Sequence, residues 1–138
     1  MTDLINWLRA CLDDDERVAR AAANYGDTWS GGSGKTLIYP SDESRHPGPI
    51  IIGPYGDLET EHTDHITRWD PARVLAEVDA KRRILDEVVP NIDSMDDQIN
   101  GEWGIGPIAA DDYASVPLLR LLALPYADRE GYRDEWRP

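Results

Sequence analysis

The sequence predicts a single α+β domain, in which two long helices and a shorter C-terminal helix pack on a small antiparallel β-hairpin sheet. Three observations support this fold class. Apolar residues recur at helical spacing in three parts of the chain, two short β-prone runs lie between glycines and prolines, and no linker or repeat divides the 138 residues. A chain of this length buries about two thirds of its unfolded surface, which is enough for one core.

The first helix is expected from Thr2 to about Tyr25. Thr2 is suited to cap it, Gly26 to follow its end, and its apolar face comprises Leu4, Ile5, Leu8, Cys11, Leu12, Ala19 and Ala22. Cys11 is the one cysteine of the chain, so no intrachain disulfide can form and a buried thiol is expected.

A variable β and loop segment is expected at about residues 26–60. Two β-prone runs, Lys35–Tyr39 and Pro49–Ile52, predict a hairpin with a long polar connection, and Trp29 is a candidate start for an earlier strand. The Gly34-Lys35-Thr36 sequence is not a phosphate loop, because Trp29 occupies the position of the first glycine of that motif and a β-prone run follows it. We interpret it as a turn.

The central helix is expected from Asp70 to Val89. Asp70 offers a carboxylate to the free N–H groups of the first turn, and Pro71 occupies the position where a missing N–H costs nothing. The apolar positions are Val74, Leu75, Val78, Leu85 and Val88, and Pro90 is expected to end the helix.

The remainder is predicted to hold an acidic loop insertion at about 91–114, a short helix over Val116–Leu124 capped by Ser115, and a tail at 125–138. One or two helical turns are possible in Asn91–Asn100, and Trp103 falls in the expected loop Gly101–Gly106. Aromatic residues recur in the tail at Tyr126, Tyr132 and Trp136, which favours a tail docked on the rest of the domain.

The formal net charge of −13, from 27 acidic and 14 basic residues, disfavours direct binding to nucleic acids and to anionic membranes. The start of the chain lacks the pattern of a signal peptide, and no apolar run approaches the length of a membrane span. We therefore expect a cytoplasmic protein. A solvated face is the ordinary explanation of the acidic runs, and a surface for a basic protein is the alternative.

Chemistry-bearing clusters are few. His62 and His65, with Glu59, Glu61 and Asp64 near them and His46 in a loop, form the one metal-like group, and a solvated helix edge is the favoured explanation of it. Neither an HExxH motif nor a GxSxG motif occurs, and 27 acids single out no catalytic pair. We expect no catalytic residue and no cofactor.

The basic cluster Lys81-Arg82-Arg83 lies on the central helix beside Glu77, Asp79 and Asp86. A face of ion pairs is its simplest interpretation. The alternative is a small anionic ligand held by Arg82 or Arg83 next to an aromatic ring.

Three sequence motifs carry a family resemblance: DDDERVARAA in the first helix, HITRWDPARVLAEVDAKRRIL around the central helix, and LLRLLALPYADREGYRDEWRP at the C-terminal end. With a Trp-led β segment, they resemble a family of small uncharacterised proteins from Streptomyces-like actinobacteria and their phages. The resemblance covers roughly 70 residues, and it implies an actinobacterial or phage accessory protein without established site residues.

The favoured function is therefore non-catalytic: binding and modulation of a protein partner, plausibly basic, with phage–host conflict as one setting. Aromatic anchors surrounded by carboxylates suit such a partner, and the candidates are Trp29, Tyr55, Trp103 and Trp136. The alternative is binding or sequestration of a nucleotide-like small molecule through aromatic rings and Arg82 or Arg83. A metal-dependent hydrolase using His62 and His65 ranks third.

Overall fold

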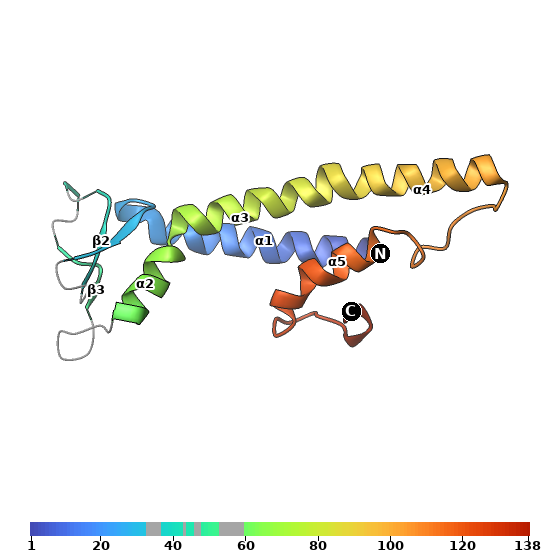
Figure 1. Ribbon diagram of the computed structural model, residues 1–138. Helices are drawn as coiled ribbons and strands as arrows, with labels where there is room; N and C mark the ends of the chain where they lie inside the picture. The colour runs from blue at the N-terminus through green and yellow to red at the C-terminus, as the bar shows by residue number, and fades with distance from the viewer. Residues whose placement is uncertain (33–36, 43, 46–47, 53–59) are drawn as a thin grey trace. The chain divides into compact units, whose positions relative to one another are not determined.

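The computed structural model describes residues 1–32, 37–42, 44–45, 48–52 and 60–138. The elements are α1 (Thr2–Ala22), β1 (Trp29–Gly31), β2 (Leu37–Pro40), β3 (Ile51–Ile52), α2 (Thr60–Arg68), α3 (Pro71–Arg83), α4 (Val89–Trp103) and α5 (Val116–Ala123) (Figure 1). The predicted α+β class and the antiparallel sheet are confirmed. Contacts within the chain divide it into two compact units: unit 1 comprises Met1–Asp13 and Asp79–Pro138, and unit 2 comprises Asp14–Val78.

Helix α1 matches the prediction closely. It continues into a 3-10 turn at Ala23–Tyr25, and Gly26 follows with a φ of 115°. A Cβ atom at Gly26 would lie 2.9 Å from the backbone nitrogen of Asp42, which itself donates to the carbonyl of Tyr25. Glycine is required there because both the positive φ and the close backbone approach exclude a side chain.

Unit 2 is built around the small sheet. Its strand order is β1-β2-β3 with antiparallel pairing throughout, Trp29 opposite Pro40 and Leu37 opposite Ile52. The expected hairpin is thus present, and β1 adds a third strand beginning at Trp29. Helix α2 contacts β1 and β2, and both Ile38 of β2 and Thr63 of α2 are fully buried.

The predicted end of the central helix at Pro90 is wrong, and the predicted loop insertion at about 91–114 is helical as far as Trp103. After α3 the chain forms a π-helical segment, Ile84–Val88, and then α4, so it stays helical to Trp103. In this segment the N–H of Val89 donates to the carbonyl of Ile84, five residues earlier. A proline ring inside a regular α-helix clashes with the carbonyl four residues before it. The wider π turn just before Pro90 relieves that conflict.

The core of unit 1 is formed by the first turns of α1, the start of α4, and α5. Its buried residues include Leu4, Leu8, Leu12, Leu85, Val89, Val116, Leu119, Ala123 and Tyr126. The apolar stripe of α5 is therefore buried within unit 1.

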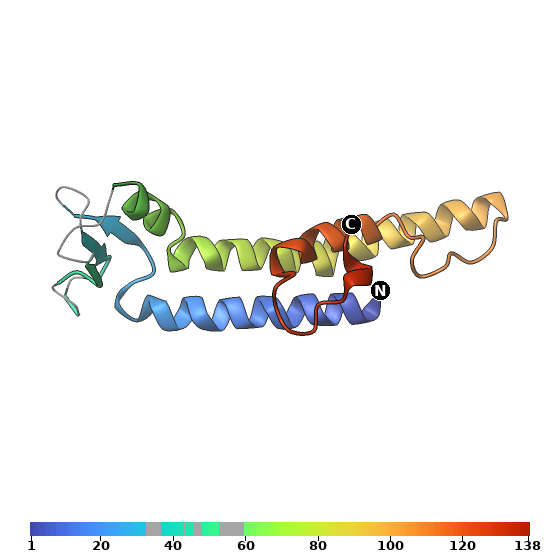
Figure 2. The same cartoon turned by 90° about the horizontal axis from the view of Figure 1, so that it is seen from below.

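Between α4 and α5 the chain turns back along α4, as Figure 2 shows. Ser115 was predicted to cap α5, but its hydroxyl makes no capping bond and donates to Asp93 of α4 at 2.5 Å instead. The Ser115 hydroxyl can bond either to a backbone group of α5 or to the carboxylate of Asp93. The carboxylate is charged and therefore forms the stronger hydrogen bond. Ser115 thus holds the returning chain on α4.

Candidate protein-interaction surface

Trp103 is the most exposed large apolar residue in the described part of the chain, with 76% of its surface accessible. It occupies the last position of α4. Gly104 follows in the left-handed conformation with a φ of 65°, and its N–H donates to Gly101 while that of Ile105 donates to Asn100. Such a left-handed glycine closes a helix by satisfying its last carbonyls. The backbone therefore fixes the indole at the helix end.

Three further exposed apolar side chains lie near Trp103 in the sequence. Met95 and Ile99 precede it by eight and four residues on the same face of α4, and Ile105 follows it; their exposed fractions are 62%, 50% and 69%. We name Met95, Ile99, Trp103 and Ile105 the Trp103 surface. Ile99 and Ile105 also line a shallow depression between α4 and the returning segment, together with Pro107 and Ile108.

The segment that carries this apolar surface is rich in carboxylates. Residues 89–114 contain no lysine or arginine, and their acidic residues are Asp93, Asp96, Asp97, Glu102, Asp111 and Asp112. The potential at the Trp103 surface is therefore negative.

Three aspartates of α4 anchor the returning segment. Asp93 accepts from the hydroxyl of Ser115, Asp96 accepts from the backbone N–H of Ala114 at 2.7 Å, and Asp97 accepts from the hydroxyl of Tyr113 at 2.9 Å. The hydrogen bond from Tyr113 to the charged Asp97 raises the pKa of the phenol above its ordinary value, with smaller contributions from burial and from the charges of Asp93 and Asp96. These bonds hold the segment that supplies Ile105 against α4.

Trp29, another predicted anchor, is half-buried in unit 2. Its backbone N–H donates to the carboxylate of Asp70 at 3.2 Å, and its indole nitrogen is buried without a hydrogen-bond acceptor among the residues that the structure describes. Trp29 therefore joins β1 to the start of α3. Tyr55, the second loop candidate, lies outside the described residues.

Trp136 was predicted as an accessible anchor, and this is corrected: only 8% of its surface is exposed. Its ring packs on Trp7 at 5.4 Å and on Tyr132 at 6.0 Å between centroids, while Arg133 covers it at 5.1 Å. The indole nitrogen of Trp7 donates to the carbonyl of Glu130 at 3.0 Å. Three aromatic rings from the two ends of the chain thus pack together, with Trp136 buried and Trp7 and Tyr132 half-buried.

Arg82 and Arg83, the predicted anion ligands, form ion pairs instead. Arg82 pairs with Asp13 of α1 at 2.5 Å, and Arg83 pairs with Glu87 at 3.1 Å. The hydrogen bond to Glu87 raises the pKa of the Arg83 guanidinium above its ordinary value. These pairs favour the structural interpretation of the basic cluster.

His62 and His65 both lie exposed on α2, and the ring of His65 is 6.5 Å from that of Trp69. Within the described residues no group of three or more histidine, cysteine or acidic side chains is arranged to hold a metal ion. His46 and Glu59, which the metal hypothesis also named, lie outside those residues.

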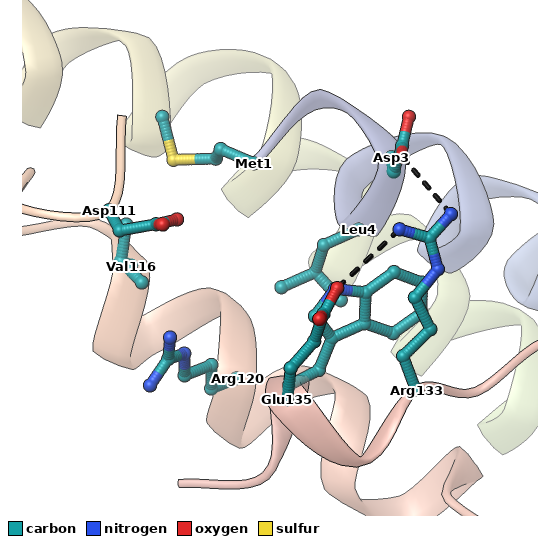
Figure 3. A pocket seen from close by; sticks show the side chains of 9 residues that line it. Met1, Asp3, Leu4, Asp111, Val116, Arg120, Arg133 and Glu135 are labelled. Carbon is teal, nitrogen blue, oxygen red and sulfur yellow. Dashed lines mark ion pairs between the residues drawn. The ribbon is translucent and has the colours of Figure 1, made fainter. Parts of the chain in front are cut away.

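Sequence reasoning missed Met95, Ile99 and Ile105, although the four-residue steps from Met95 to Trp103 were a usable signal. Because Pro90 predicts a helix end, the sequence alone does not place these residues on one helical face. It also missed Arg120, which lines a pocket near the start of α1 with Arg133 and Trp136 (Figure 3).

Fold and surface together define a small acidic α+β protein with an apolar surface at one helix end. The chain belongs to the family described as "Family of unknown function (DUF6221)", whose model matches residues 1–138. No curated protein and no solved structure matches the chain significantly. Among the described helices, none has both the length and the apolar character needed to cross a membrane.

Proposed function

We propose that this chain is a non-catalytic accessory protein that binds a basic protein partner through the Trp103 surface and modulates that partner. The exposure of Trp103 beside Met95, Ile99 and Ile105 is the observation that supports it. Tryptophan is the side chain most often found at the energetic centre of protein interfaces. Covering these four residues would remove a contiguous apolar surface from water, which is the main driving force of association.

The carboxylates around the surface select the kind of partner. A second copy of the chain would bring the same acid-rich segment against itself, and like charges across an interface are repulsive. A partner segment with an apolar face flanked by lysine or arginine would match both features. Charge complementarity would also accelerate the encounter, and salt would weaken that effect.

The two alternatives have less support. The nucleotide-binding hypothesis requires Arg82 or Arg83 to bind the anionic group of the ligand, but both guanidinium groups form ion pairs with carboxylates. The hypothesis of a metal-dependent hydrolase requires His62 and His65 as metal ligands, and both residues lie on the exposed side of α2. We further propose a cytoplasmic protein of actinobacterial or phage origin, with phage–host conflict as its setting, on the strength of the sequence resemblance.

A Trp103→Ser variant tests the proposal against the matched control Trp69→Ser, which removes a tryptophan that is 47% exposed in unit 2. Calorimetry would measure binding to an amphipathic leucine–lysine helical peptide and to its leucine–glutamate counterpart. We expect the lysine peptide alone to bind, more weakly at high salt. Trp103→Ser should weaken it about 30-fold, and the control should bind normally.

Capture from an actinobacterial lysate with the same variants would then identify the natural partner. A single basic protein retained by the wild type and the control, and lost with Trp103→Ser, is the expected result. Equal binding by Trp103→Ser in both experiments, or equal binding of the acidic peptide, would contradict the proposal.

A further inference from the structure

A second recess in unit 1, separate from the Trp103 surface, lies where the start of α1 meets α5 and the C-terminal segment. Its volume is about 260 Å³. Leu4, Val116 and Trp136 contribute apolar side chains that are 3%, 5% and 8% exposed. Charged residues complete the lining, and Figure 3 shows them around the opening: Asp3, Asp111, Arg120, Arg133 and Glu135.

The charged side chains on one side of this pocket form ion pairs with one another. Arg133 pairs with Asp3 at 3.1 Å and with Glu135 at 3.5 Å, as the dashed lines in Figure 3 indicate. The guanidinium also lies near the ring of Trp136. Through these contacts Arg133 links the C-terminal segment to α1.

The charges on the other side are different. Arg120 projects from α5 and Asp111 from the segment just before it, and neither side chain makes a hydrogen bond or an ion pair with any residue that the structure describes (Figure 3). They form no ion pair with each other. In a chain with 27 acids and 14 bases, a half-buried arginine is expected to find a carboxylate. Arg120 and Asp111 therefore present one positive and one negative group to the same space.

We propose that this pocket binds a small zwitterion, a molecule with one carboxylate and one ammonium group on a short apolar backbone. The carboxylate accepts two parallel hydrogen bonds from the Arg120 guanidinium, whose fork matches carboxylate geometry. The ammonium group donates to Asp111, and the backbone of the ligand lies against Val116 and Leu4.

The remaining charges exclude other ligand classes. A phosphate carries about 1.5 to 2 negative charges and a dicarboxylate about two. The pocket lining has three carboxylates (Asp3, Asp111 and Glu135) against two guanidinium groups (Arg120 and Arg133), so like-charge repulsion disfavours either ligand. A simple amine would leave the half-buried Arg120 without a partner, and a simple carboxylate would gain no contact with Asp111, which is exposed. One group of each sign on the ligand satisfies both residues.

Calorimetry on the full chain tests this with a series of α-, β- and γ-amino acids, in which the separation of the two charges increases. Acetate, ethylammonium and inorganic phosphate serve as single-sign controls. At millimolar concentrations we expect at least one zwitterion to bind and the single-sign compounds not to bind. Arg120→Gln and Asp111→Asn should each weaken the best zwitterion about tenfold or more, which is the loss of one charge-assisted contact.

Two variants control for general charge effects. Arg68→Gln removes another arginine that has no ion pair among the described residues but lies outside the pocket, and Asp112→Asn removes the neighbouring carboxylate. Both should bind the zwitterion as the wild type does, and unchanged unfolding curves would show that all four variants fold. The proposal is overturned if no zwitterion binds, if acetate or phosphate binds as tightly, or if Arg120→Gln retains full affinity.

Discussion

At the scale of single residues, carboxylates hold this molecule together by accepting backbone and hydroxyl hydrogens. Asp70 is the clearest case, because it is only 8% exposed and both of its oxygens are used. One accepts from the N–H of Arg73 at 2.9 Å as a helix cap, and the other accepts from the N–H of Trp29. The first of these bonds follows from the sequence, whereas the second joins residues that are 41 positions apart.

Replacing Asp70 with alanine should therefore cost about 2 kcal/mol of unfolding free energy, the upper end of the range for a lost helix cap. Asp70→Asn keeps a good capping oxygen but only one acceptor, so an intermediate loss is expected. Urea denaturation measures both, with Asp79→Ala on the exposed side of α3 as the control. An asparagine variant as stable as the wild type would show that the bond to Trp29 contributes nothing.

The Tyr113–Asp97 pair predicts a pH dependence. Because the pKa of Tyr113 is raised in the folded state, the pair stabilises the fold below the ordinary phenol pKa of about 10, and this stabilisation is lost as the pH rises through the raised value. The unfolding free energy of Tyr113→Phe should therefore fall less than that of the wild type when the pH is raised through this value. Urea denaturation above and below that pH would measure the difference. A wild type and a variant that lose stability in parallel would contradict this prediction.

At the scale of elements, the start and the end of α4 each depend on an unusual backbone conformation. The π turn at Ile84–Val88 allows the helix to pass Pro90, and the left-handed Gly104 ends it directly after Trp103. The position of the Trp103 surface follows from both the π turn and the left-handed glycine, because they set the length of the helix that carries it.

Two glycines at this helix end should respond in opposite ways to alanine. Neither has an atom within 4 Å of an added Cβ, so only the backbone conformation matters. Gly104→Ala forces an L-residue to a φ of 65° and should cost about 1–2 kcal/mol, with Gly104→Asn less affected. Gly101→Ala lies within the helix and should stabilise it by about 0.5–1 kcal/mol.

Hydrogen exchange of the last α4 amides, together with helical circular dichroism, would measure these changes. We expect exchange to accelerate in Gly104→Ala and to slow in Gly101→Ala. The same sign of effect in both variants would mean that α4 does not end at Gly104.

At the scale of the whole molecule, the two ends of the chain meet in one aromatic cluster. Trp7 near the start packs against Tyr132 and Trp136 near the end, and Arg133 adds an ion pair to Asp3. That ion pair is exposed and contributes little, since surface pairs are worth roughly 0–1 kcal/mol. The packing of the rings, and above all the burial of Trp136, therefore supplies most of the stability of this contact.

Trp136→Ala should consequently cost about 3–5 kcal/mol, as expected for a buried tryptophan, whereas Trp69→Ala should cost about 1 kcal/mol or less. A cycle with Trp7→Ala should be non-additive, because removing either ring already breaks the contact. Urea denaturation provides these values. A loss for Trp136→Ala no larger than that for Trp69→Ala would show that the cluster does not stabilise the fold.

The sequence by itself determined the features that depend on neighbouring residues. Local chemistry sets the span of α1, the β-prone runs of β2 and β3, and the start of α3 at Asp70, since caps, turns and periodicity act within a few positions. The exposure of Trp103 also agrees with its place in a polar, glycine-rich segment, although its binding role stays a prediction.

Tertiary structure alone decided which aromatic and charged groups are covered. Trp136 is buried because Trp7, 129 positions earlier, lies against it, and Arg82 is neutralised by Asp13 on another helix. Arg120 and Asp111 have no ion-pair partner among the described residues for the same reason, since the fold brings their two segments to one pocket without placing an opposite charge within ion-pair distance of either. Local patterns do not encode which segments meet, so the accessibility of a side chain is fixed only when the chain has folded.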